Sequence, residues 1–420
     1  MLALGRRPAL VALALMPALL GGACTSSSQQ APVLPSTITI GLLTPRTGAT
    51  APMGLDAIRG AELAIDLVNN PYPDVPLPLG PSAGLRNGVK LGLAIGDTQG
   101  APERIEEQTS RLVKDGAVGL VLADDIAVAR SAGRQADIMS VAIVDALSTA
   151  DLFSDLNRSG HYRIQPSDRS TVQSTMALLF RQHAVGKKVE RISVAAPSTS
   201  VGYNEEAEAI RKSINDIAQA DGYVVPAPLA LGTGGASPAE LASTVTGNKS
   251  DVVIAIVTNA QEAAAAVDLA ARLKGTVPVI TIGPAVESVD VAKAGQTDVL
   301  RSSGWSAEYT RRNPVAAQVA QLYERRYSTK LTEVAAATFM STLALAVAAD
   351  SAKGLTAGDV RGAVQQLTLS ATQTIMPWDG IRFDGNGNNQ LAASVVEQRT
   401  SGGFQVIHPV ELAATPLAWP

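Results

Sequence analysis

The chain has 420 residues, more than one ordinary domain of roughly 100–200 residues, so we expect two lobes. Apolar residues make up 46% of the sequence and aromatic residues only 4%. This bias toward small and branched side chains suits helices packed on parallel sheets. The formal net charge of −4, without a basic stripe, argues against nucleic-acid binding and against docking of the folded domain on anionic lipid.

Residues 1–23 have the organisation of a signal peptide. Two arginines precede an apolar stretch at 9–20, which is too short to span a bilayer comfortably, and small residues come directly before Cys24. The segment resembles a bacterial lipoprotein signal, which implies that Cys24 carries the lipid and becomes the mature N-terminus. Gly21 stands where such signals usually have leucine, so a plain secretory signal with a leftover cysteine is the alternative.

A polar tether is predicted to follow the signal. Residues 24–36 begin with the sole cysteine of the chain, which excludes an internal disulfide, and continue with threonine, serine and glutamine typical of a flexible linker. Farther along, no hydrophobic run is long and pure enough to predict a membrane helix. The apolar stretch 343–349 is short and lies inside a helical pattern.

Strands and helices are predicted to alternate from residue 37 onward. Apolar and β-branched residues predict a strand at 37–43, and apolar residues at helical spacing predict a helix at 57–68. A loop rich in proline and glycine follows at 71–88. The next predicted elements are strands at 90–96, 118–123 and 141–144 and a helix at 103–114.

The alternation continues beyond residue 162. It predicts parallel sheets with helices on both faces, and in such sheets ligands bind beyond the carboxyl ends of the strands. A terminal hairpin is predicted around an Asp-Gly-Asn-Gly turn, with strands at 381–383 and 393–397. The other predicted elements are helices at 169–184, 205–220, 261–273, 315–327 and 335–352 and strands at 192–196, 251–257 and 277–282.

Several motifs occur in the order known from one family. They are T-P-R-T-G at 44–48, M-G at 53–54, R-G-A-E-L-A at 59–64, G-D-T-Q-G-A-P at 96–102, Y-R-I-Q-P-S-D at 162–168 and I-R-F-D-G-N-G at 381–387. Together they resemble the type I periplasmic binding proteins. Within that family they look more like the branched-chain amino acid and amide receptors of ABC transporters, which have a leucine-binding-protein-like domain.

The resemblance implies an α/β fold of two lobes, each a parallel sheet with helices on both faces, with the ligand cleft between the lobes. It also implies three crossings of the chain between the lobes, which we expect near 164–168, 283–287 and 355–380. Hinge motion would close the lobes over the ligand. Lobe 1 is expected to comprise residues 37–165 plus 284–360, and lobe 2 residues 166–283 plus 361–420.

The loop after the fourth predicted strand holds the leading candidates for ligand binding. Ser148 and Thr149 align with a family position that offers a hydroxyl and backbone groups to the ligand, and Asp145 begins the same loop. Capping of a short helix at 150–153 is the alternative role for these side chains.

Two other loops of the first lobe carry candidates. Asp124 and Asp125 stand where amino-acid receptors usually have a serine, and either would repel a ligand carboxylate. Asp125 suits a helix N-cap, which leaves Asp124 as the candidate contact for a ligand cation or N–H donor. Met53 falls at a position that often contacts the ligand, where it would give an adaptable apolar contact; packing on its own lobe is the alternative.

In the second lobe the family's Tyr-Gly motif is altered, and Tyr203 follows it as a candidate for covering the ligand or for packing. Thr258 and Asn259 end a buried strand where a pocket is expected. The acidic residue that commonly holds an α-ammonium group falls near Ala285, with Glu287 two positions on. These departures weaken the case for an α-amino acid as the ligand and leave an amide, a nucleobase-like ring or a polyamine as alternatives.

Signals of catalysis and metal binding are weak. A G-x-S-x-G pattern at 80–84 lies in the Pro-rich loop without the preceding strand that a nucleophile elbow needs. His161, His183 and His408 do not have metal-ligand spacing, and the acidic turn starting at Asp384 lacks the full ligand set of a calcium loop. We therefore expect a protein that is not an enzyme and has no cofactor or metal.

The sequence thus predicts an extracytoplasmic solute-binding lipoprotein, held at the cell membrane by lipid on Cys24 or, without the lipid, secreted or periplasmic. It would capture a small polar solute, amino acid or amide-like, and pass it to the permease and ATPase subunits of an ABC importer. Two alternatives share the fold: a ligand-sensing receptor for an envelope signalling partner, and a ligand-free structural envelope lipoprotein.

Overall fold

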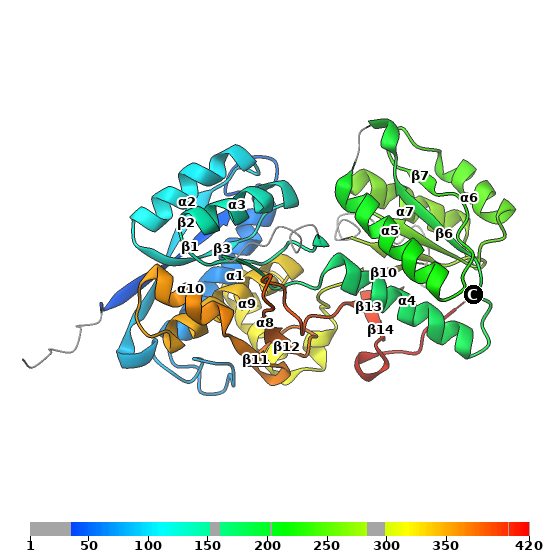
Figure 1. The fold of residues 1–420 in the computed structure, drawn as a ribbon. Helices are drawn as coiled ribbons and strands as arrows, with labels where there is room; N and C mark the ends of the chain where they lie inside the picture. Colours follow the sequence, from blue (N-terminus) through cyan, green and yellow to red (C-terminus); the bar gives the residue numbers. More distant parts are fainter. Residues whose placement is uncertain (1–34, 152–159, 202–203, 284–298, 402, 420) are drawn as a thin grey trace, which may run out of the picture. The chain divides into compact units, whose positions relative to one another are not determined.

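The computed structural model describes residues 35–151, 160–201, 204–283, 299–401 and 403–419, drawn as coloured ribbons in Figure 1. The predicted signal peptide and tether, including Cys24, lie outside the described residues, as do Tyr203 and Glu287. The described residues belong to one compact unit.

The first lobe is built on a five-stranded sheet in the order β2-β1-β3-β4-β5, and every neighbouring pair is parallel. Its central strands are apolar runs that are buried from end to end, as expected for a parallel sheet covered on both faces. The strands are β1 (Thr37–Thr44), β2 (Lys90–Asp97), β3 (Ala117–Leu122), β4 (Ile143–Asp145) and β5 (His161–Arg163).

Helices cover both faces of this sheet. On one face, Leu112 of α2 and Val128 of α3 share a core cluster with Leu120 of β3. On the other face, Leu345 of α9 fills the space beside Gly119 of β3. The helices of this lobe are α1 (Ala51–Asn69), α2 (Ile105–Lys114), α3 (Ile126–Ile138), α8 (Pro314–Tyr327), α9 (Glu333–Ser351) and α10 (Ala357–Gln365).

Helix α9 is the central packing element of its face. It is apolar around its whole circumference, and among the described residues it is the sole helix long and apolar enough to cross a membrane by length and composition. However, 78% of its most apolar 18-residue window is buried inside the protein. It packs on α1 so closely that a Cβ on Gly60 would lie 2.3 Å from the Ala335 carbonyl oxygen. The burial identifies α9 as a core helix.

The second lobe is built on a seven-stranded sheet in the order β14-β13-β10-β9-β8-β6-β7. Alternate residues of β8 separate its two faces: Ile254 packs with α4 and α5, whereas Val253 packs with α6 and α7. The strands are β6 (Ile192–Pro197), β7 (Leu229–Leu231), β8 (Val252–Ile256), β9 (Val279–Ile282), β10 (Val299–Ser303), β13 (Val395–Thr400) and β14 (Gly403–His408). The helices are α4 (Asp168–Ala184), α5 (Glu205–Ala220), α6 (Pro238–Gly247) and α7 (Ala260–Arg272).

The second crossing lies later in the chain than expected, and so does the lobe boundary expected at residue 361. β10 pairs with both β9 and β13, so the chain leaves the second sheet only after Ser303, not near 283–287. Helix α10 packs on α9 and β3, so residues 361–365 belong to the first lobe. The expected lobe boundaries at residues 284 and 361 are therefore displaced. The reason at β10 is its sequence, because its last three residues are polar and give no apolar strand signal.

The predicted terminal hairpin is wrong. Strand β12 (Gly380–Arg382) pairs with β11 (Thr368–Ser370), and β13 pairs with β10 and β14. The Asp-Gly-Asn-Gly turn between β12 and β13 instead extends the edge of the first sheet, where Asn388 bridges Arg163 of β5. The sequence of the turn predicted the turn correctly, but it did not predict the strands with which β12 and β13 pair. Strand pairing is decided by packing elsewhere in the fold.

The three crossings meet at one place. The Asn389 side-chain amide donates to the Ile164 and Gly380 carbonyls at 3.1 and 3.2 Å. Gly304 lies against Gln165 so closely that a Cβ there would come within 2.2 Å of the glutamine Oε1 atom. These contacts join the first crossing to each of the other two.

Candidate functional site

Four strands of the first sheet end in register at one edge. Thr44 at the end of β1 pairs with Asp97 at the end of β2, and Leu122 of β3 pairs with Asp145 of β4. Because carboxyl ends of parallel strands share an edge, the loops that follow them form a common surface. The ends of β2, β3 and β4 each carry an acidic residue that the structure places in a hydrogen-bond network.

Asp97 shapes the loop after β1. Its carboxylate accepts hydrogen bonds from the backbone N–H groups of Arg46 and Thr47 at 2.9 and 3.2 Å and from the Thr47 hydroxyl at 2.7 Å. Burial works to raise its pKa, but these hydrogen bonds hold the pKa below its usual value. The loop then packs on the first turn of α1, where a Cβ on Gly54 would lie 2.0 Å from the Pro45 carbonyl oxygen.

Met53 lies in that first turn of α1 and is partly exposed. Its neighbour Gly54 fixes how closely the turn approaches the loop after β1. The ligand contact expected of Met53 remains a prediction.

Asp124 and Asp125 divide their roles at the end of β3. Asp125 caps α3, since its carboxylate accepts from the Val128 N–H at 3.0 Å, which confirms the predicted cap. Asp124 is buried and accepts from the Thr98 hydroxyl and from the Asp125 N–H. Burial raises its pKa to about 6 despite these hydrogen bonds. Both oxygens of Asp124 therefore already have donors within the first lobe, and its role toward a ligand cation remains a prediction.

Asp145 organises the loop that holds Ser148 and Thr149. Its buried carboxylate accepts from the N–H groups of Leu147 and Ser148 at 3.1 and 3.0 Å, and it lies 2.9 Å from His161 Nε2. Burial would raise the pKa of Asp145, but hydrogen bonds from His161 and Ser148 hold it below its usual value. The structure thus uses Asp145 to set the course of the loop.

Ser148 and Thr149 lie next to each other on this loop in different environments. Ser148 is buried, and its hydroxyl makes no hydrogen bond of good geometry within the part of the chain that the structure describes. The Thr149 carbonyl accepts from Arg163 Nη1 at 2.6 Å and from the Asp168 N–H at 2.8 Å. The loop is therefore tied to β5 and to the start of α4, while the Ser148 hydroxyl lies close enough to Asp145 to lower the pKa of that carboxyl.

In the second lobe, Thr258 and Asn259 are bound to one buried acid. Glu262 accepts from the Thr258 N–H and hydroxyl at 2.7 and 2.9 Å and from the Asn259 side-chain amide at 2.7 Å. Asn259 also caps α7. The Asn204 amide reaches the Thr258 hydroxyl at 3.1 Å. The structure joins these predicted residues in one capping network, and contact with a ligand remains a prediction.

Sequence reasoning missed two acidic residues. Asp168 is the first residue of α4 and is only 5% exposed, and Glu206 lies in the first turn of α5. Burial first, and the charge of Glu206 second, raise the pKa of Asp168 to about 7. Burial also raises the pKa of Glu206. Asp168 ends the Y-R-I-Q-P-S-D motif, but an acid at a helix start is ordinarily explained by the helix dipole, so its burial gave no sequence signal.

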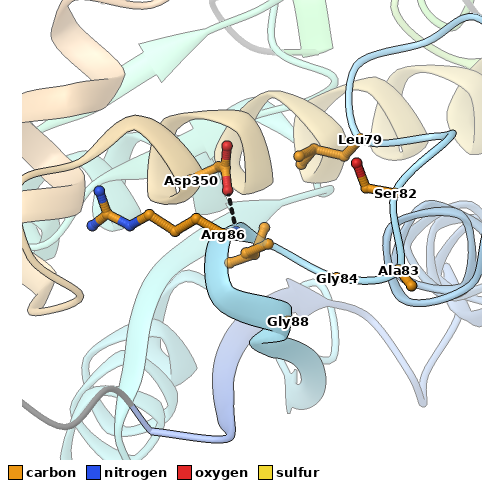
Figure 2. Close-up of a pocket in the computed structure, with 8 residues that line it drawn as sticks. Leu79, Ser82, Ala83, Gly84, Arg86, Gly88 and Asp350 are labelled. Carbon is orange, nitrogen blue, oxygen red and sulfur yellow. Dashed lines mark hydrogen bonds between the residues drawn. The ribbon is translucent and has the colours of Figure 1, made fainter.

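A pocket of about 410 Å³ lies apart from these loops (Figure 2). It is formed by residues 79–88 against the end of α9, where the Arg86 N–H donates to Asp350 at 2.6 Å. Ser82 of the G-x-S-x-G pattern lines it, but no histidine or cysteine stands among its lining residues to activate that hydroxyl. Among the described residues, no three His, Cys, Asp or Glu side chains converge as metal ligands.

Comparisons with known proteins identify a matching family and solved structures of similar fold. The sequence model of a family described as periplasmic binding protein matches residues 37–403. No curated protein sequence matches the chain. Solved structures of similar fold have low sequence identity to the chain, so they establish the fold alone.

Three of these structures illustrate the similarity in fold. A putative branched-chain amino acid ABC transporter protein from Silicibacter pomeroyi has a TM-score of 0.75 and 16% identity, covering 91% of this chain and 99% of that one. An ABC transporter substrate-binding protein from Desulfitobacterium hafniense, in complex with Leu, has a TM-score of 0.69 and 17% identity, with 88% and 99% covered. A solute-binding protein from R. palustris, in complex with benzoate, has a TM-score of 0.64 and 15% identity, with 91% and 98% covered.

Proposed function

The chain belongs to the periplasmic binding protein family, and on that premise we propose that it captures a small polar solute outside the cytoplasm and delivers it to an ABC importer. The permease and ATPase subunits of that importer are its proposed partners. The proposed solute is an amino acid or an amide-like molecule. Lipid on Cys24 is the proposed membrane anchor.

The observation that carries the proposal is the loop after β4. Asp145 fixes its course through the Leu147 and Ser148 N–H groups, and Arg163 holds its far end through the Thr149 carbonyl. A binding site needs side chains held in place before the ligand arrives, because ordering them on binding costs free energy. The Ser148 hydroxyl is such a group, since it is held in a fixed loop beside the Asp145 carboxylate and makes no hydrogen bond of good geometry within the described residues.

The first experiment is a thermal-shift screen of the mature chain starting at Ser26, which lacks Cys24. The solutes are branched-chain and other amino acids, amides, purines, polyamines and aromatic acids. A solute at about a hundred times its Kd stabilises the fold by roughly 2.7 kcal/mol, which raises Tm measurably. A cooperative melt that no solute in the panel shifts would count against solute capture.

A pair of serine variants tests the site with whichever solute binds. Ser148→Ala is expected to weaken binding about fivefold to tenfold while lowering Tm only modestly, because the contact of its hydroxyl with Asp145 falls short of a hydrogen bond of good geometry. Ser341→Ala is the matched control, since Ser341 in α9 is also buried without a hydrogen-bond partner for its side chain. Equal affinities of the two variants would remove Ser148 from the site.

A further inference from the structure

The two acidic residues at the starts of α4 and α5 lie near each other in the second lobe. Both helices pack on the same face of the seven-stranded sheet, and Asp168 and Glu206 occupy their first turns. Apart from burial, the charge of Glu206 does most to raise the pKa of Asp168. The fold therefore places two carboxylates where each makes the other harder to ionise.

The helix dipole does not account for this arrangement. A first-turn acid that complements the dipole is normally solvated, and the dipole favours its charged form. Asp168 is 5% exposed, and its Oδ2 atom accepts no hydrogen bond within the part of the chain that the structure describes. A buried carboxylate without a donor costs free energy, so its presence calls for a partner.

The hydrogen-bond donors around Asp168 and Glu206 do not satisfy all of the carboxylate oxygens. Thr149 lies close enough to lower the pKa of both carboxylates by hydrogen bonding, but a hydroxyl has one proton to donate. Arg163 faces Asp168, but its two Nη atoms donate to the Thr149 and Ala150 carbonyls, each at 2.6 Å, and to Asn388 at 2.8 Å, and its buried Nε atom makes no hydrogen bond to Asp168. The set thus leaves the Asp168 Oδ2 atom without a donor and has surplus negative charge.

We propose that Glu206, Thr149 and Asp168 receive a cationic nitrogen of the solute, an ammonium or amidinium group; this rests on the proposed function. Such a group supplies both positive charge and several N–H donors. Glu206 is partly exposed and meets the nitrogen, while Asp168 lies behind it and adds a second negative charge. An organic nitrogen fits better than a metal ion, because no metal-ligand cluster forms among the described residues.

The surrounding charges favour the same ligand class. Asp125 at the start of α3 raises the pKa of Glu206, and Asp151 in the loop after β4 raises that of Asp168, whereas Arg163 of β5 lowers it. Among these groups the acids outnumber Arg163, so the set would repel a ligand carboxylate. Because a bound cation favours ionised carboxylates, it must displace protons from this set, and binding should strengthen as pH rises from 6 to 8.

The test is titration calorimetry of the mature chain with 1,4-diaminobutane, spermidine and agmatine at pH 6, 7 and 8, beside butyramide, benzoate and leucine. We expect at least one of the three amines to bind, with affinity that rises with pH. Glu206→Gln should weaken that binding at least about tenfold. Glu205→Gln is the matched control, since Glu205 is exposed and paired with Arg130, and should change affinity less than about twofold.

A second variant guards against a folding defect. Asp168→Asn keeps the backbone N–H that binds the Thr149 carbonyl, and it should flatten the pH dependence of amine binding. Binding of benzoate or butyramide alone, or of any probe with an affinity that Glu206→Gln leaves unchanged, would overturn the cation site and leave solute capture standing. If none of the six compounds binds, the cation site is overturned. The wider thermal-shift screen then tests the proposed function separately.

Discussion

At the scale of single residues, hydrogen-bonded carboxylates at the ends of strands and helices set the local geometry and divide into two kinds. Burial alone would raise the pKa of Asp97 and Asp145, but their hydrogen bonds prevail and lower it. For Asp124 and Asp168 burial prevails, and the pKa rises to about 6 and about 7. Asp97 and Asp145 in their ionised form stabilise the fold at pH values above about 4, the pKa of an aspartate in the unfolded chain. This stability is lost as pH falls. The second pair reduces stability as pH rises from about 4 toward 7.

Replacing Asp168 should therefore stabilise the solute-free protein at neutral and higher pH. The folded state binds a proton at Asp168 more tightly than the unfolded state, so ionisation costs stability between about pH 4 and pH 7, with a ceiling of about 4 kcal/mol. Asp168→Asn removes that cost. Its Tm should exceed that of the parent at pH 8 by more than at pH 5, as measured by calorimetric melts at both pH values.

The control for this prediction is Glu106→Gln, an exposed acid in the first turn of α2. It should shift Tm equally little at both pH values, because an exposed surface substitution usually changes stability by no more than about 0.5 kcal/mol. A loss of Tm in Asp168→Asn at pH 8 would show that the ionised carboxylate stabilises the fold.

At the scale of elements, the sequence signal was strongest where one residue pattern decides the outcome. Apolar periodicity located β1, α5 and α9, because burial of one face or of the whole element leaves a direct imprint on sequence. It failed at β10, whose buried Arg301 is instead bonded to Glu397 of β13 at 2.6 Å. It also missed Asp168, because the donors around a buried acid come from distant parts of the chain.

Close packing of α1 on α9 gives a prediction at the same scale. Gly60→Ala should destabilise the protein by about 1–3 kcal/mol, because the new Cβ would meet backbone atoms of Ala335 that have little room to move. Gly362→Ala is the matched control within α10, where a Cβ would meet nothing within 4 Å, and it should stabilise by about 0.4–1 kcal/mol. Denaturant melts of both variants measure the difference, and equal stabilities would contradict the packing argument.

At the scale of the whole molecule, the three crossings couple the lobes through a few polar contacts. Asn389 joins the third crossing to the first, and the Trp378 indole N–H donates to the Gly304 carbonyl of the second at 2.7 Å. The alternation of strands and helices predicted parallel sheets covered by helices, and the chain length predicted two lobes. Neither could locate the second and third crossings, because a crossing is defined by which sheet the next strand joins.

The proposed lipid anchor is also a property of the whole molecule, and it gives the last prediction. Without residues 1–23, which contain two arginines and no acid, the formal charge falls from −4 to −6, so the folded domain has no electrostatic attraction to anionic lipid. Lipid on Cys24 would then be the dominant hold on the membrane.

Cys24→Ala should move the full-length protein from the membrane to the soluble extracytoplasmic fraction of a bacterial host and abolish incorporation of radiolabelled palmitate. Ser26→Ala, two residues along the tether, should stay membrane-bound and labelled. Membrane retention of Cys24→Ala would assign the anchor to another part of the chain, and a parent protein without label would favour the plain secretory signal.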